Sequence, residues 1–138
     1  MFSNKEDKNT NQTNLVKVGA LLIHAAKIDE NYSVEEEKII KLTLLNLGAD
    51  EAYLDNLITE AQKYEKNANQ ILDFTREVKN ISYSDKVKII ESLWKIIYSD
   101  NSADIYETNL MRRLGGLLYI DTKIMGDLKE KIKKELGK

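Results

Sequence analysis

Apolar residues recur at helical spacing along most of the chain, beginning at Asn14. Over residues 14–28 they occupy nearly every face, which is typical of a helix buried in the middle of a bundle. Later stretches carry them on one face, at spacings of three and four residues. This pattern predicts six further helices, beginning near residues 33, 50, 67, 84, 104 and 121. Residues 14–138 are therefore expected to form one all-α domain of about seven helices.

Capping residues mark the ends of several of these helices. Ser33-Val34-Glu35-Glu36 is a capping box, in which the hydroxyl and the last carboxylate satisfy two otherwise unpaired backbone N–H groups. Gly48 is a favourable C-terminal cap for the helix that this box begins. The expected N-caps of four later helices are Asp50, Ser84, Asp104 and Asp121.

A shift of about 71 residues, without gaps, aligns the first half of the pattern with the second. Chance could align a few leucines, but the shift also aligns capping positions and acids. The aligned pairs include Asp29 with Asp100, Ser33 with Asp104, Glu36 with Glu107, and Asp50 with Asp121. We therefore expect two three-helix repeats with pseudo-two-fold symmetry, joined by a helix over residues 67–80.

Composition narrows the classes of function. The 138 residues are 42% hydrophobic and 32% charged, with no proline, which favours a soluble helical domain. A net charge of −2 gives no field that would attract nucleic acid. The absence of cysteine excludes disulfides, thiolate catalysis and zinc–thiolate sites.

The N-terminal stretch gives the expected cellular location. Residues 1–13 are polar and lack an apolar core, so they are expected to be a flexible leader instead of a signal peptide. No apolar run reaches the length of about 18 residues that a membrane span needs. The protein is expected to be cytoplasmic, with no integral membrane segment.

Two acidic turns, Asp29–Glu36 and Asp100–Glu107, hold the candidate chemistry. Each begins with an Asp at the negative C-terminal end of an apolar helix, where a carboxylate costs about 0.3–1 kcal/mol. Either an Asx-type bond to the turn or a shared cation would offset this cost. The candidate metal ligands are Asp29, Ser33, Glu36, Asp100, Ser102, Asp104 and Glu107.

The oxygen-rich ligand set favours Ca²⁺ or Mg²⁺ over Zn²⁺. Asp100-x-Ser102-x-Asp104 has the spacing that opens a calcium loop, but Ile105 replaces the usual glycine and Glu107 comes too early, so the turn is not an EF-hand. The alternative for Glu36 and Glu107 is purely structural, as third residues of capped helices.

A few further residues are candidates for catalysis or binding. His24, the only histidine, is expected to be a packing or partly exposed side chain instead of a catalytic one. Arg112-Arg113 and Lys129–Lys138 could contact an acidic partner, although a solvated face suits the second stretch better. Near the second turn, the side chains expected in the core or at its rim, with a partner-binding patch as the alternative, are Trp94, Tyr98 and Tyr106.

The acidic turns resemble those of the TerB family, the helical domain of tellurite-resistance proteins. The family pattern is an Ala-Asp-Gly turn followed by Ser or Asp and then Glu, present in both halves. The corresponding segments here are Lys27-Ile28-Asp29-Glu30 and Tyr98-Ser99-Asp100-Asn101, and the resemblance is strongest over Ile89–Glu107 and covers residues 14–136. Glu30 and Asn101 stand where glycine is typical, and Glu adopts a left-handed conformation poorly.

The resemblance implies an all-α fold with an acidic surface that binds metal or partners, and no established enzymatic reaction. The leading hypothesis is a non-enzymatic stress-response interaction module whose acidic turns meet an unidentified protein partner. The alternative is a dedicated metal-ion-binding protein of tellurite or metal stress response. A carboxylate-dependent enzyme is the third and least favoured hypothesis.

Overall fold

The computed structural model describes the backbone of residues 3–28, 32–68, 72–99 and 105–138. Side chains are described over the same ranges except residues 3–13, 77 and 105–107. These residues form helices and connecting turns without strands, so the all-α prediction is confirmed. The helices are α1 (Ser3–Ala26), α2 (Val34–Asn46), the 3₁₀ turn η1 (Glu51–Tyr53), α3 (Leu54–Asn67), α4 (Leu72–Val78), α5 (Tyr83–Tyr98), α6 (Ile105–Leu117) and α7 (Thr122–Glu135).

Helix starts agree with the predicted caps in most cases. Asp50 and Asp121 each accept a hydrogen bond, from the N–H groups of Ala52 and Lys123 respectively, at 3.0 Å. Asp121 caps α7 as predicted, whereas Asp50 caps the turn η1, and α3 itself begins at Leu54. The cap of α5 is Ser82, which accepts from the N–H of Asp85 at 3.1 Å, so the prediction of Ser84 was wrong by two residues. Both serines precede apolar residues at helical spacing, and only the folded backbone distinguishes them.

The two halves end their second helix in the same way. Gly48 after α2 and Tyr119 after α6 both have positive φ, 105° and 58°. At each end a backbone bond of 2.9 Å reaches five residues back, which closes the helix in a Schellman-type motif. These bonds run from Ala49 to Leu44 and from Ile120 to Gly115. The C-terminal bounds of α2 and α6, Asn46 and Leu117, also differ by the predicted 71 residues. Pseudo-two-fold symmetry of the complete halves stays a prediction.

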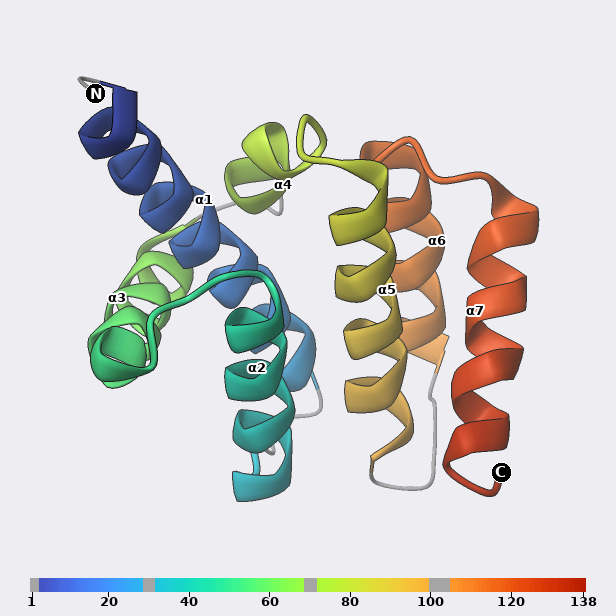
Figure 1. Cartoon of the computed structure of the whole chain (residues 1–138). Coiled ribbons are helices and arrows are strands. Elements are labelled where there is room, and N and C mark those ends of the chain that lie inside the picture. Colours follow the sequence, from blue (N-terminus) through green and yellow to red (C-terminus); the bar gives the residue numbers. More distant parts are fainter. Residues whose placement is uncertain (1–2, 29–31, 69–71, 100–104) are drawn as a thin grey trace.

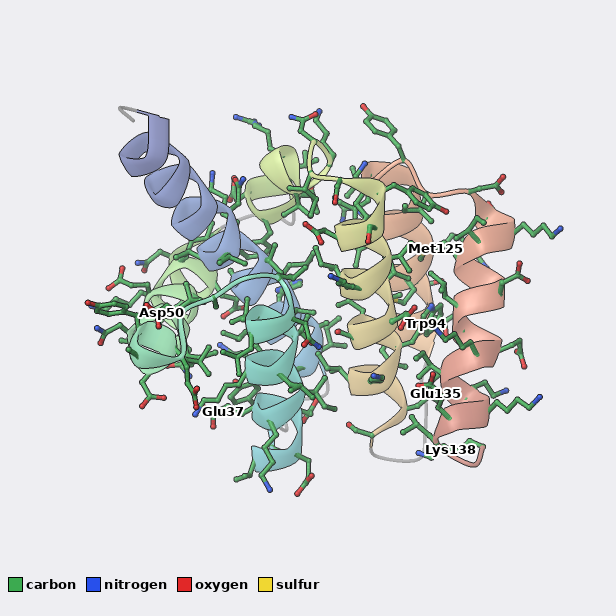
Figure 2. The ribbon with its side chains drawn as sticks, in the orientation of Figure 1. Glu37, Asp50, Trp94, Met125, Glu135 and Lys138 are labelled. Atoms are coloured by element: carbon green, nitrogen blue, oxygen red, sulfur yellow. The ribbon has the colours of Figure 1, made fainter. Side chains whose placement is uncertain are left out.

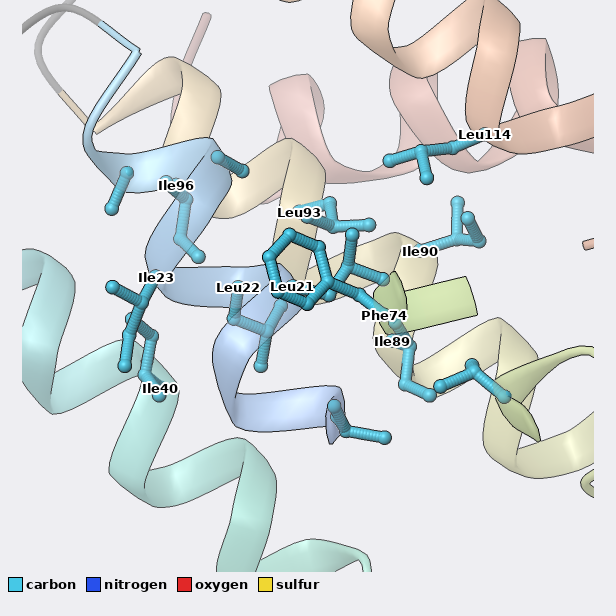
Figure 3. Packing of buried hydrophobic residues seen from close by; sticks show 14 of the residues in the cluster. Leu21, Leu22, Ile23, Ile40, Phe74, Ile89, Ile90, Leu93, Ile96 and Leu114 are labelled. Carbon is cyan, nitrogen blue, oxygen red and sulfur yellow. The ribbon is translucent and has the colours of Figure 1, made fainter. Parts of the chain in front are cut away.

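Helices α1 and α5 supply most of the core, as the apolar pattern of residues 14–28 predicts. Figure 3 shows Leu21 and Leu22 of α1 close to Leu93 of α5, with Ile40 of α2 beside α1. All four side chains are fully buried. Burying a leucine or isoleucine side chain stabilises the fold by about 1.5–3 kcal/mol, so this contact between the halves is a main source of stability.

Packing places α1–α4 on one side of the molecule and α5–α7 on the other (Figure 1). Helix α1 packs against α3 and α4, and α5 packs against α7, while α1 and α2 both contact α5. The hydroxyls of Thr43 and Ser92 meet at 2.6 Å across the contact of α2 with α5. Lys86 of α5 is buried and donates to the carbonyl of Leu118 at 3.0 Å, where a cation suits the C-terminal end of α6.

Two helices differ in extent from their predictions. Helix α1 begins at Ser3, well before Asn14, so its first residues are helical although they lack apolar spacing. The described part of helix α4 is Leu72–Val78, and the helix ends two residues before the predicted end at Asn80. Leu72, predicted on its apolar face, is exposed, whereas Phe74 is buried. Whether residues 1–13 are flexible stays a prediction.

Candidate functional site

The N-terminal flank of α2 carries the only two predicted metal ligands whose side chains the structure describes, Ser33 and Glu36. They form the predicted capping box. The Ser33 hydroxyl accepts from the N–H of Glu36 at 3.1 Å, and the Glu36 Oε1 atom accepts from the N–H of Ser33 at 2.9 Å. Glu36 is only 5% exposed. The structural explanation of this acid is therefore observed directly.

The capping box does not by itself prevent Ser33 from binding a cation. A hydroxyl oxygen has two lone pairs, and the cap uses one of them. Hydroxyl and carboxylate oxygens are also the ligands that Ca²⁺ and Mg²⁺ prefer. The donor chemistry of Ser33 and Glu36 thus fits a hard cation.

The other predicted ligands cannot be placed. Asp29, Asp100, Ser102 and Asp104 lie outside the described residues, as does the side chain of Glu107. Within the part of the chain that is described, no three His, Asp or Glu side chains gather in a way that could hold a metal ion. The cation site at the turns stays a prediction.

Tyr32 lies directly before the capping box, with its hydroxyl buried. Burial, together with the carboxylates of Glu37 and Glu36, raises the pKa of Tyr32 to about 12. A phenolate would be both desolvated and repelled there, so the hydroxyl stays protonated. The carboxylates of Glu37 and Glu36 thus place negative charge near Tyr32 at the described edge of the first turn.

The helix ends that flank the two turns lie toward one end of the molecule. Figure 1 shows α1 and α5 ending, and α2 and α6 beginning, toward the lower end of the view. Ile28, just after α1, lines the same pocket as Leu110 of α6. The fold therefore brings the flank of the first turn to the helix that follows the second.

This pocket has a volume of about 460 Å³, and the described residues that line it are Ile28, Asn109, Leu110 and Arg113. It combines two aliphatic side chains with an amide and a guanidinium group. Sequence reasoning noted Arg113 only as part of a basic pair and did not single out Asn109. The available signal was helical spacing, because positions 109, 110 and 113 share one face of a helix.

Trp94 and Tyr98 are buried, at 4% and 9% exposure, so they belong to the core and not to a binding patch. Their rings stack with centroids 6.0 Å apart. Lys129 and Lys133 of α7 lie over Trp94 and Tyr98 at 5.6 and 5.9 Å from the ring centroids. Part of the lysine-rich C-terminal stretch therefore covers aromatic rings, and the prediction of a purely solvated face was incomplete.

Lys138 lies beside the end of α5, where its ammonium group donates to the carbonyl of Tyr98. Figure 2 shows Trp94 and Lys138 between α5 and α7, with Lys138 nearer the end where α5 stops. A cation at a helix C-terminus is favourable. Sequence reasoning missed this contact because it joins residues 40 positions apart.

His24 is a packing residue, as expected. Its ring lies 5.5 Å from that of Phe74, and its Nδ1 atom is 3.4 Å from a carboxylate oxygen of Glu65. Lys27 binds the other oxygen of Glu65 at 2.9 Å. The three charged or polar groups join the end of α1 to the end of α3.

The comparisons with known proteins identify a family. The model of the TerB family, described as tellurite resistance protein TerB, matches residues 15–130. No curated protein and no solved structure matches the chain. Among the described residues, no helix is long and apolar enough to cross a membrane.

Proposed function

The chain belongs to the TerB family, related to tellurite resistance, and from this premise we propose that it is a non-enzymatic interaction module of the stress response. Its partner surface is formed by the acidic turns at residues 29–36 and 100–107. The partner is a protein, met in the cytoplasm. No catalytic role is assigned to any residue.

One observation carries this proposal. The four helix ends that flank the turns lie toward the same end of the molecule, and Ile28 beside the first turn shares a pocket with α6. From this placement of the flanking helices we propose that the two turns contribute to one partner surface. A surface of this kind suits a protein partner, because stable interfaces bury roughly 800 Å² on each side.

A divalent cation at the same turns is the second candidate function, and Ca²⁺ or Mg²⁺ is proposed ahead of Zn²⁺. The donor chemistry of Ser33 and Glu36 supports it. In that case, ion binding would organise the turns or would itself be the function of the protein.

The cation proposal is tested by titrating the chelator-treated protein with Ca²⁺, Mg²⁺ and Zn²⁺ while recording amide NMR shifts. We expect saturable shifts centred on residues 29–36 and 100–107, absent from the Asp29→Asn/Asp100→Asn variant. The matched control is Asp127→Asn, which removes one exposed carboxylate from α7. Flat spectra up to millimolar metal would contradict cation binding.

The interaction proposal is tested with a purified candidate partner identified by cross-linking. Binding should weaken by about tenfold or more in the Asp29→Asn/Asp100→Asn variant, because charge-assisted contacts are lost. Asp127→Asn should bind as the unmodified protein does. Equal binding by all three proteins would show that the turns are structural only.

A further inference from the structure

The pocket between the end of α1 and helix α6 is an open depression of the surface that brings aliphatic and polar side chains together. Its volume of about 460 Å³ lies within the range of small-molecule pockets, roughly 300–1,000 Å³. Leu110 is buried and Ile28 is half-buried, so the two aliphatic side chains form an apolar floor. Asn109 and Arg113 are exposed and supply polar groups at its edge.

The three pocket residues from α6 lie on one face of that helix. Asn109 and Arg113 are four positions apart, and Leu110 and Arg113 are three apart, so their side chains are neighbours along the helix surface. Ile28, just after α1, lines the same pocket. An amide, two aliphatic groups and a guanidinium group thus border one open pocket.

The packing of the core does not require an arginine at position 113. Within the described residues, Arg113 forms no ion pair. Leu42, which the 71-residue shift aligns with Arg113, is 60% exposed. Since the position is exposed in both halves, the core requires no particular side chain there. An arginine with no ion pair in the described part of the chain, beside an apolar floor, is suited to a carboxylate, which a guanidinium group can bind through two parallel hydrogen bonds.

We propose that this pocket binds the C-terminal residue of a partner polypeptide, an aliphatic side chain with its free carboxylate. Arg113 binds the carboxylate, and Ile28 and Leu110 contact the aliphatic side chain. Asn109, which has both a donor and an acceptor, binds the preceding peptide group. The inference rests on the proposed function in one respect only, that this end of the bundle meets a protein.

The probe is N-acetyl-leucine, which has the carboxylate, the aliphatic group and one peptide group. It is titrated into the full chain at constant pH and ionic strength, to tens of millimolar, because a ligand this small is expected to bind with roughly millimolar affinity. Saturable NMR shifts are expected at Ile28, Asn109, Leu110 and Arg113, including the Arg113 side-chain N–H. N-acetyl-leucinamide, which lacks the carboxylate, should bind about tenfold more weakly.

Two variants test the role of the guanidinium group. Arg113→Gln should weaken N-acetyl-leucine binding about tenfold, whereas Arg112→Gln, the adjacent exposed arginine outside the pocket lining, should leave it unchanged. The proposal is overturned by equal effects of the two variants, by equal affinity for acid and amide, or by the absence of saturable shifts at the pocket. Tighter binding of free leucine would also overturn it, since a free amino acid would then be the ligand.

The outcome is separable from that of the proposed function. If the Asp29→Asn/Asp100→Asn variant still binds its protein partner, the proposed function is contradicted. If that variant also still binds N-acetyl-leucine, the pocket is nevertheless supported. Loss of partner binding in that variant, with no probe binding in the unmodified chain, overturns the pocket alone.

Discussion

At the scale of single residues, the described edge of the first acidic turn is organised by its own helix. Glu36 is buried, and its carboxylate accepts a hydrogen bond from the N–H of Ser33. Replacing a capping serine by alanine typically costs about 1 kcal/mol, which is enough to explain the residue pair without a cation. Tyr32 is affected by the same acids, through the raised pKa of its hydroxyl.

Tyr32 should make stability depend on pH in alkaline solution. Its pKa is raised from 10.0 to about 12 in the folded protein, so between these pH values the unfolded chain has released a proton that the folded protein retains. The unfolded state then binds fewer protons, and the free energy of unfolding decreases as the pH rises from about 10 toward 12. Tyr32→Phe removes this contribution, so the variant should lose less stability than the unmodified protein over that range.

Urea denaturation at a series of pH values from about 9 to 12 measures the difference. Tyr53→Phe is the control, because it removes the hydroxyl of a tyrosine that is 57% exposed. Parallel loss of stability in all three proteins would contradict the assignment to Tyr32.

At the scale of elements, the two halves of the chain resemble each other in how α2 and α6 end. Gly48 and Tyr119 hold the same left-handed position after α2 and α6. Glycine adopts this conformation without steric cost, whereas an L-residue is strained by roughly 1–2 kcal/mol. Tyr119 lies beneath Lys79 and Lys86, at 5.9 and 5.8 Å from its ring centroid, and these contacts offset part of its strain.

Two glycine substitutions should therefore change the free energy of unfolding in opposite directions. Gly48→Ala places a Cβ atom at φ 105° and should lower the free energy of unfolding by about 1–2 kcal/mol. Gly116→Ala lies within α6, where a Cβ atom would meet nothing within 4 Å, and should raise it by about 0.5–1 kcal/mol. Chemical denaturation checks both, and a stabilising Gly48→Ala would show that the end of α2 can adopt another conformation.

At the scale of the whole molecule, close packing between helices sets the arrangement of the first half. Gly19 of α1 faces α3, where an added Cβ atom would lie 2.9 Å from the Cβ of Ala61. A larger residue at either position must move the two helices apart. The end of α1, and with it Ile28 at the pocket, depends on this crossing.

Gly19→Ala should destabilise the protein although alanine favours helix formation. The helix gain is about 1 kcal/mol, whereas overpacking a close contact costs about 1–3 kcal/mol, so we expect a net loss of up to about 2 kcal/mol. Ala61→Gly removes the Cβ atom that causes the clash. In the Ala61→Gly background, Gly19→Ala should therefore no longer lower the free energy of unfolding. A double-mutant cycle by chemical denaturation measures this difference. Additive losses in the cycle would contradict a direct contact between the two positions.

Much of the fold, and less of the candidate site, could be predicted from the sequence. The apolar spacing of α1 and α5, the box at Ser33 and the cap at Asp121 are local signals, because each depends on residues within one or two helical turns. Ser82 instead of Ser84 at the start of α5 shows the limit of such signals. The predicted ligands of the second turn remain untested, since Asp100 and Asp104 lie outside the described residues.

The sequence by itself determined the helical class, most helix ends and the offset of 71 residues between the halves. Those features follow from backbone hydrogen bonds and side-chain spacing along a single segment. Only the tertiary structure decided that Ile28 and Arg113 line one pocket, that Trp94 is buried under Lys129, and that Lys138 reaches the end of α5. These contacts join residues far apart in the chain, and their formation depends on how the helices pack, which no local pattern encodes.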